Sequence, residues 1–165
     1  MYMIFSVLGL IGGILCAIAD MLLDLKGKNN KKLGENGLVD SNWEYMSEWR
    51  FKASFLIVMI GVPMYAMGMW SLSEQIGGII GTILKFVTFV GPMGGFFIHG
   101  FVCLMPIVYK NSSDKEQAIA VIDKMYGTIK IPFLFLFFVL TLASTVLVII
   151  AMFNGSLDVP WFCMV

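Results

Sequence analysis

Residues 86–109 read FVTFVGPMGGFFIHGFVCLMPIVY, and these 24 consecutive positions contain no Asp, Glu, Lys or Arg. The hydrocarbon core of a bilayer is about 30 Å thick, so roughly 20 apolar residues of α-helix are enough to cross it. Lipid offers no partners to backbone N–H and C=O groups, which excludes a lone strand or an irregular segment at that depth. The stretch therefore predicts a transmembrane helix.

Three further runs without these charged residues have the same character, at residues 1–19, 53–73 and 131–157. Apolar residues make up 59% of the chain and charged residues only 13%, about half the share found in soluble domains. The sequence predicts an all-α, polytopic membrane protein. We expect a single domain, a four-transmembrane-helix bundle with spans at about 2–24, 53–73, 82–109 and 131–154.

The basic residues predict how the chain is oriented in the membrane. All of them except Lys85 fall in two loops: Lys26, Lys28, Lys31, Lys32, Arg50 and Lys52 in the first, and Lys110, Lys115, Lys124 and Lys130 in the second. Because basic loops stay on the cytoplasmic side, loops 25–52 and 110–130 are predicted to be cytoplasmic and both termini to lie outside an inner (plasma) membrane. Eleven basic residues balance eleven acidic ones, which argues against nucleic acid as a partner.

Each cytoplasmic loop is predicted to carry a short interfacial helix. Ser41 with Glu44, and Ser113 with Glu116, have the spacing of a capping box, in which both side chains bond the backbone at a helix start. Aromatic residues near basic ones in the first loop are typical of a membrane interface: Trp43, Tyr45 and Trp49. Two interpretations stay open, because the loops either only anchor the spans or form a docking surface for a partner or an anionic headgroup.

The third span is unusually long and rich in glycine. The Gly91-Pro92 pair favours a break, because proline lacks a backbone N–H and disfavours helix in the residue before it. Either residues 77–84 form an external loop that leads into one kinked helix, or residues 76–90 form a half-helix that enters the membrane and returns. We favour the kinked helix.

A stripe of four residues runs along this span, since Gly91, Gly95, His99 and Cys103 recur every four positions. Gly91 and Gly95 form a G-x-x-x-G motif, which predicts close packing of another helix. His99 is the only histidine, and eleven residues of helical rise from Lys110 place it roughly 16 Å deep. A polar group at that depth is functional or is bonded to a hydroxyl or carbonyl; Thr141 and Ser144 are candidate partners.

Asp20 and Asp24 lie one helical turn apart at the end of the first span. Asp20 falls in the margin of the hydrocarbon region, where an unpaired carboxylate is protonated or finds a partner. Its candidate partners are Lys26, Lys28, Arg50 and, if the helices tilt, His99. The alternative is a helix end whose charge is neutralised by the nearby lysines.

Metal and cofactor chemistry have little support in the sequence. The three cysteines, Cys16, Cys103 and Cys163, form no C-x-x-C pair. One histidine cannot supply the two axial ligands of a haem or the histidine cluster of a di-iron site. We therefore predict no metal and no cofactor.

Four groups of residues in the first three spans form a recognisable pattern: Ala19-Asp20, SEWRF at 47–51, GVP at 61–63 with Gly68, and GGFFIHG at 94–100. In these segments the chain resembles an uncharacterised family of small bacterial polytopic membrane proteins. The resemblance implies a bacterial inner membrane and no known activity. It also implies relatives that continue further, and the apolar ending at 160–165 would suit a truncated chain or a lost fifth span.

Three function classes stay open. The first is binding or transport of a small molecule or ion at an intramembrane site, for which the candidate residues are His99, Asp20, Asp24, Cys103, Tyr65 and Arg50. The second is a structural or regulatory subunit that packs through the Gly-rich span as a homo-oligomer or against a membrane partner protein. The third is an enzyme acting on a lipid or lipophilic substrate, with His99 as general base. Besides the lipid bilayer, the predicted ligand is a small molecule or a lipid.

Overall fold

A computed structural model describes residues 2–136 and 142–158. These residues form five α-helices, whose bounds are α1 Tyr2–Asp24, α2 Glu48–Ile76, α3 Gly78–Asn111, α4 Lys115–Phe135 and α5 Ala143–Phe153. Between α1 and α2 lie two short strands, β1 (Lys32–Leu33) and β2 (Val39–Asp40), and a 3-10 helix, η1 (Ser41–Glu44). The predicted helical fold class is confirmed.

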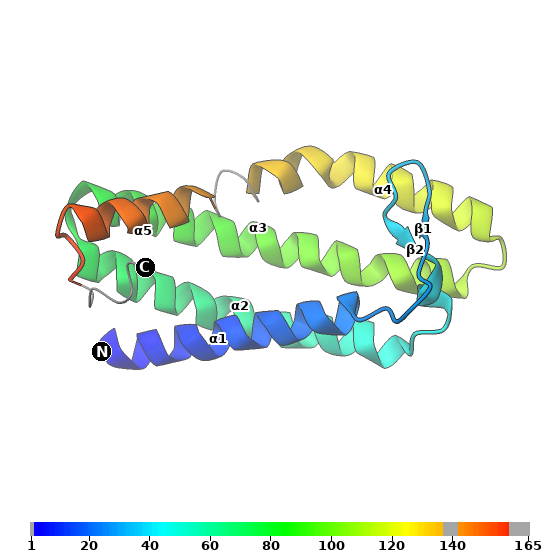
Figure 1. Cartoon of the computed structure of the whole chain (residues 1–165), viewed down its shortest axis with the longest axis horizontal. Helices are drawn as coiled ribbons and strands as arrows, with labels where there is room; N and C mark the ends of the chain where they lie inside the picture. The colour runs from blue at the N-terminus through cyan, green and yellow to red at the C-terminus, as the bar shows by residue number, and fades with distance from the viewer. Residues whose placement is uncertain (1, 137–141, 159–165) are drawn as a thin grey trace.

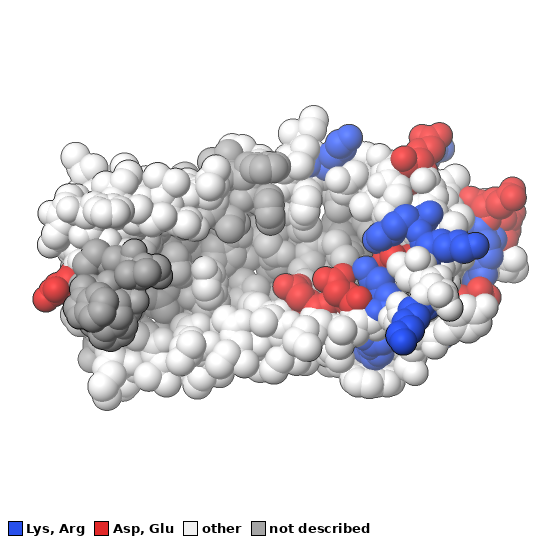
Figure 2. Space-filling model, in the orientation of Figure 1, with Lys and Arg blue, Asp and Glu red and all other residues white. Residues whose placement is uncertain are grey.

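The helices form a row in which each contacts the next: α1 lies against α2, α2 against α3, and α3 against both α4 and α5. Figure 1 shows α4 and α5 following one another along α3, on the side away from α1. The hairpin of β1 and β2, η1 and the α3–α4 connection lie together at one end of the molecule. We call this end the basic end, because the lysine and arginine side chains gather there in Figure 2.

Three of the described helices, α1, α2 and α3, are long and apolar enough to cross a membrane. The bounds of α1 agree with the predicted span 2–24, whereas α2 and α3 extend beyond the predicted spans 53–73 and 82–109. The predicted fourth span, 131–154, includes the end of α4 and the 11-residue α5, with residues 137–141 between them outside the described part of the chain. A fourth transmembrane helix therefore stays a prediction.

A close helix–helix contact joins α1 to α2 through glycines. Gly9 faces Gly68 and Gly12 faces Gly61, so that the two backbones touch with no side chain between them. Close backbone approach at small residues is how helices pack in lipid, where association gains little from the hydrophobic effect. The glycines that allow this contact were not predicted to do so.

The structure does not place the close contact at the predicted G-x-x-x-G motif. Gly95 is exposed, and a methyl group added there would meet no described atom within 4 Å. Its neighbour Gly94 is the residue that packs closely, against the side chain of Leu136. Gly95 thus packs against none of the described helices, and the helix-packing role of Gly91 and Gly95 stays a prediction.

The connection between α2 and α3 is a single glycine. Gly77 has φ +63°, a left-handed conformation that glycine adopts without steric cost, and α3 starts at the next residue. Gly81 then lies against the carbonyl of Ser73, so α3 turns back directly along α2. The predicted external loop at 77–84 and the alternative re-entrant half-helix at 76–90 are both wrong. Nor does Pro92 unwind the helix, since α3 is continuous across it.

The first interfacial helix was predicted at the wrong place. Ser41 starts only the four-residue η1, and its hydroxyl accepts a bond from the backbone N–H of Lys31 in the hairpin. A capping box with Glu44 is therefore absent, and α2 begins later, at Glu48. The side chain of Ser41, which the capping box would need, is instead bonded to the hairpin of β1 and β2, whose turn contains Asn36 and Gly37.

The second loop contains a helix, but that helix starts with a different cap. Asp114 is the N-cap of α4, and its Oδ1 accepts a bond from the backbone N–H of Gln117 at 3.0 Å. The predicted Ser113 and Glu116 box is shifted by one residue. α4 then continues without interruption into the start of the fourth apolar run. The predicted loop helix and the start of the predicted fourth span therefore belong to the same helix.

A core of buried side chains fills the basic end. Trp43, predicted at the membrane interface, is buried there and makes an edge-to-face contact with Tyr109, their ring centroids 6.3 Å apart. Ala118 and Ile122 of α4 reach the same core. Residues from the hairpin, η1 and four helices, α1 to α4, thus hold the ends of the long helices in register.

Candidate functional site

The only histidine of the chain connects three helices at one point. On α3, His99 has Nε2 2.9 Å from Oγ of Ser54 on α2 and Nδ1 3.4 Å from Oδ1 of Asp20 on α1. The Ser54 hydroxyl donates to the carbonyl of Ala19 at 2.8 Å and accepts from the thiol of Cys103 at 3.7 Å. Ser54 is fully buried, whereas the side chain of Asp20 is 65% exposed. The site is a polar chain that leads from the interior to an exposed carboxylate.

The directions of these bonds determine how many protons the site holds. A serine hydroxyl has one proton, and that of Ser54 is used in its bond to Ala19. His99 Nε2 must therefore carry a hydrogen and donate it to Ser54. The remaining nitrogen, Nδ1, faces Asp20, and this contact is favourable only if a proton lies on Nδ1 or on the carboxyl group. The contact thus favours states in which the Asp20–His99 pair carries one proton.

The same three residue types form a catalytic triad in hydrolases, but the bonds here run in the opposite direction. In a triad the serine hydroxyl donates to the histidine and then attacks a substrate that reaches it. Here Ser54 accepts the histidine proton, and it is 0% exposed. This geometry suits a group that holds a proton rather than a nucleophile.

Three of the six residues predicted to bind a ligand, His99, Asp20 and Cys103, meet at this site. The predicted contact of Asp20 with His99 is present, whereas Lys26 and Arg50 bond other groups and Lys28 forms no ion pair with a described residue. Asp24 lies one turn further along α1, where its carboxylate is exposed and pairs with Lys26 at 3.1 Å.

The two other candidates lie apart from the imidazole. Arg50 donates to the backbone carbonyl of Leu25 at 2.9 Å, which closes the last turn of α1. Tyr65 is eleven residues beyond Ser54 on α2, about 16 Å away by helical rise, and its backbone lies against Gly12. Neither belongs to the Asp20–His99 site.

Ser54 is the member that the sequence analysis missed. The partner of His99 was sought in the fourth apolar run, of which Thr141 lies outside the described residues. The available signal was a hydroxyl at the beginning of the second apolar run, close to the end predicted to be cytoplasmic, at which Asp20 lies. The depth in the membrane could not by itself identify Ser54, because Thr141 and Ser144 of the fourth run also fitted.

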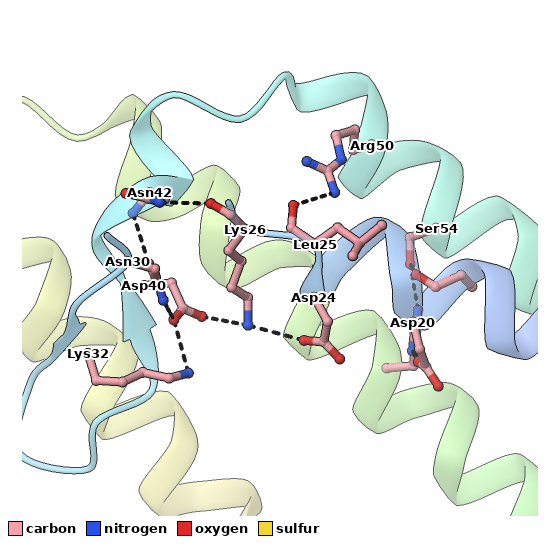
Figure 3. A network of polar contacts seen from close by, with 12 residues as sticks. Asp20, Asp24, Leu25, Lys26, Asn30, Lys32, Asp40, Asn42, Arg50 and Ser54 are labelled. Carbon is pink, nitrogen blue, oxygen red and sulfur yellow. Dashed lines mark hydrogen bonds and ion pairs between the residues drawn. The ribbon is translucent and has the colours of Figure 1, made fainter. Parts of the chain in front are cut away.

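A second polar centre holds the hairpin to α1 (Figure 3). Asp40 on β2 is only 1% exposed, and its carboxylate lies 2.7 Å from the ammonium of Lys26 and 3.0 Å from that of Lys32. Asn30 donates a hydrogen bond to the same carboxylate, and Lys26 also bonds Asp24. The three donors offset the free-energy cost of burying the charge of Asp40. This centre therefore fixes the loop between α1 and β2.

Both charged partners of this centre are shifted toward their ionised forms. Burial by itself favours neutral Asp40, but hydrogen bonds from Lys26, Asn30 and Lys32 outweigh it and hold the pKa of Asp40 below its ordinary value. Burial likewise favours neutral Lys26, yet its bonds to Asp40 and Asp24 raise the pKa of Lys26. The ion pair therefore persists through the neutral pH range.

The tip of the hairpin is bound to α4 by one carboxylate. Asp123 accepts from the backbone N–H of Glu35 at 3.0 Å and from the side chain of Asn36 at 3.1 Å. Gly34 beside them has φ +84°, and a side chain there would collide with Asp123. The hairpin thus bridges the two edges of the helix row, from α1 to α4.

Two hollows lie outside the Asp20–His99 site. The larger, about 560 Å³, is apolar and is lined mainly by α2 and α3, with residues such as Pro63, Trp70 and Phe89. The smaller, about 460 Å³, lies at the basic end and is lined by Leu25, Lys26, Gly27, Lys28, Asn42, Tyr45, Met46, Ser47 and Arg50. Within residues 2–136 and 142–158, no cluster of three or more His, Cys, Asp or Glu side chains could hold a metal ion.

The sequence profile of DUF6796, a family of unknown function, matches residues 1–165, the whole chain. The chain belongs to this family. The predicted likeness to an uncharacterised family is confirmed. Neither a curated protein nor a solved structure matches this DUF6796 chain, so its function must be argued from its own residues.

Proposed function

We propose that the protein is a multi-span membrane protein that binds a small cation at Asp20 and exchanges it for the proton held between Asp20 and His99. The observation that carries this proposal is the polar chain Ser54–His99–Asp20, which ends at an exposed carboxylate. Carboxylate and imidazole groups among apolar helices are costly, and they commonly mark ion or substrate pathways.

The chemistry follows from the single shared proton. A cation bound to the Asp20 carboxylate competes with the proton for the same oxygen atoms, so binding one favours release of the other. His99 accepts or returns that proton, and Ser54 keeps the imidazole oriented through Nε2. Cys103, which also contacts Ser54, fills the interior beside it.

In this proposal α1, α2 and α3 cross the membrane, and a fourth crossing runs from the end of α4 to the end of α5. The basic end faces the cytoplasm, and both termini lie outside. The distribution of Lys and Arg supports this orientation, since basic loops are retained on the cytoplasmic side (Figure 2). The exposed face of Asp20 is then near the cytoplasmic end of α1.

The proton count can be measured directly, because a single histidine gives a single set of ring ¹⁵N signals. In lipid nanodiscs, we expect Nε2 to be protonated and Nδ1 to share a proton with Asp20. Asp20→Asn removes the shared proton and leaves Nε2 hydrogen-bonded, whereas Ser54→Ala alters the Nε2 signal. Asp24→Asn, one turn away and paired with Lys26, serves as the control and should leave both signals unchanged. Identical spectra in wild type and Asp20→Asn would refute the shared proton.

Exchange itself can be tested in proteoliposomes that contain a pH-sensitive dye. Addition of sodium, potassium or methylammonium ions tests whether cation binding is accompanied by proton movement. We expect at least one of them to move protons in the wild type, with a loss of roughly tenfold or more in His99→Ala, the range typical for removal of a proton-transfer group. Unchanged proton movement in His99→Ala would exclude the role given to His99.

A further inference from the structure

The smaller hollow, at the basic end, has three cationic residues and no acidic one among the described residues that line it. Lys26, Lys28 and Arg50 line it, together with the backbone of Gly27 and the amide of Asn42. Asn42 donates to the carbonyl of Lys26 at 2.7 Å (Figure 3). It also donates to the carbonyl of Lys28 at 3.2 Å, so the loop that forms one wall is held in place. The hollow is therefore a built feature of the fold.

Two of the three cations have no acidic partner among the described residues. Lys26 is occupied by Asp40 and Asp24, whereas Lys28 takes part in no ion pair. Arg50 uses one nitrogen to bond the Leu25 carbonyl, which leaves most of its five N–H donors available. The positive charge in this hollow is thus only partly compensated.

The surroundings of the hollow place it at the level of lipid headgroups. It lies where α1 ends and α2 begins, at the ends of two helices that are apolar enough to cross a membrane. Tyr45, which lines it, is 82% exposed, and Trp49 beside Arg50 is 62% exposed. Exposed aromatic rings at helix ends are typical of the membrane interface, and Leu25 adds an exposed apolar side chain on the wall.

We propose that this hollow binds the phosphate of an anionic lipid headgroup, with Lys28 and Arg50 as its cationic ligands. Arginine matches phosphate oxygens through two parallel N–H donors, and lysine adds a point charge. The lipid tails would continue along the apolar surface beside Leu25. This site is separate from the Asp20–His99 pair and does not depend on the function proposed for that pair.

The test compares phosphatidylglycerol with phosphatidylcholine of the same acyl chains. The purified full chain in detergent is mixed with both lipids at equal concentration, and bound lipids are counted by native mass spectrometry. We expect a preference for phosphatidylglycerol that falls roughly tenfold to thirtyfold in Lys28→Gln/Arg50→Gln, because each cation near a membrane surface contributes a factor of about five. The ammonium group of Lys28 forms no ion pair with a described residue, and the bond from Asn42 goes to its backbone carbonyl. Lys28→Gln alone should therefore fold normally and lose part of the preference.

A control of equal charge is Lys124→Gln/Lys130→Gln, which removes two exposed lysines of α4 outside the hollow. The lipid preference of this variant should stay near that of the wild type. Three results would overturn the proposal: equal binding of both lipids by the wild type, an unchanged preference in Lys28→Gln/Arg50→Gln, or an equal loss in the control. Displacement of phosphatidylglycerol by millimolar inorganic phosphate would also overturn it, because the ligand would then be free phosphate.

Discussion

Gly12→Ala is expected to lower the free energy of unfolding by about 2–3 kcal/mol, at the upper end of overpacking effects. A methyl group at Gly12 would come within 3 Å of three backbone atoms of α2, among them the carbonyl oxygen of Gly61 at 2.6 Å. Backbone atoms cannot rotate away as a side chain can, so α1 and α2 would have to separate. Separation also removes contacts around the Gly9 and Gly68 pair, which lies further along the same two helices.

The adjacent residue offers a matched control. A methyl group at Gly13 would meet only a ring carbon of Tyr65, at 3.9 Å, which is ordinary van der Waals contact. Gly13→Ala should therefore leave stability nearly unchanged or raise it slightly, since alanine favours helix over glycine. Unfolding in mixed micelles of increasing SDS content measures both variants, and equal stabilities would contradict the glycine contact.

Asp40→Asn should release the hairpin from α1, with a loss of about 2–3 kcal/mol. Removing one partner of a buried ion pair costs about 3–5 kcal/mol, because the other charge is left uncompensated. We expect less here, because Lys26 keeps Asp24 and Lys32 is 57% exposed. Hydrogen exchange at the Ser41 amide, which donates to the carbonyl of Lys31, reports on the hairpin directly. That amide should exchange roughly 30- to 150-fold faster in the variant.

The pKa values of Asp40 and Lys26 determine how the stability of the hairpin should change with pH. The pKa of Asp40 lies below its ordinary value of 3.8, so the stabilising contribution of its ion pairs is complete above that value. It is lost as the pH falls through the lower pKa of the folded state. The stabilising contribution of Lys26 is lost at alkaline pH instead, as the pH rises beyond 10.5. Wild-type protection at the Ser41 amide should therefore decline in acid, and Asp40→Asn should show little of that decline.

The exposed neighbour Asp24 is the control for this experiment. It bonds the same lysine but its side chain is 73% exposed, and exposed ion pairs contribute less than about 1 kcal/mol. Asp24→Asn should leave hairpin exchange close to that of the wild type. If both variants behaved alike, the buried position of Asp40 would not be what stabilises the hairpin.

Of the three residues of the polar chain, His99 and Asp20 could be predicted from the sequence and Ser54 could not. His99 and Asp20 were recognisable because ionisable residues are rare in apolar runs, and their joint presence is visible in the chain. Ser54 was not recognisable as the partner, because serine is common in membrane helices and often bonds its own helix. Only the relative rotation of α1, α2 and α3 brings these three side chains together.

The strands of the hairpin were not predicted from the sequence, for a different reason. The Asn36-Gly37 turn was visible, but two strands of two residues carry too little alternation to be recognised. Their pairing depends on Asp40, a carboxylate that is stabilised in a buried position only by lysines and an asparagine some ten residues away. A capping box was predicted instead, because local spacing alone cannot show where Ser41 finds its partner.

The sequence by itself determined the helical class, the full extent of α1 and the end of the molecule at which basic residues gather, because hydrophobic length and charge are local properties of the chain. The tertiary structure decided which glycines carry the close helix contact, that Gly77 alone joins α2 to α3, and which hydroxyl bonds His99. These features depend on how the helices are rotated and shifted against one another. Side chains far apart in the sequence set that arrangement together.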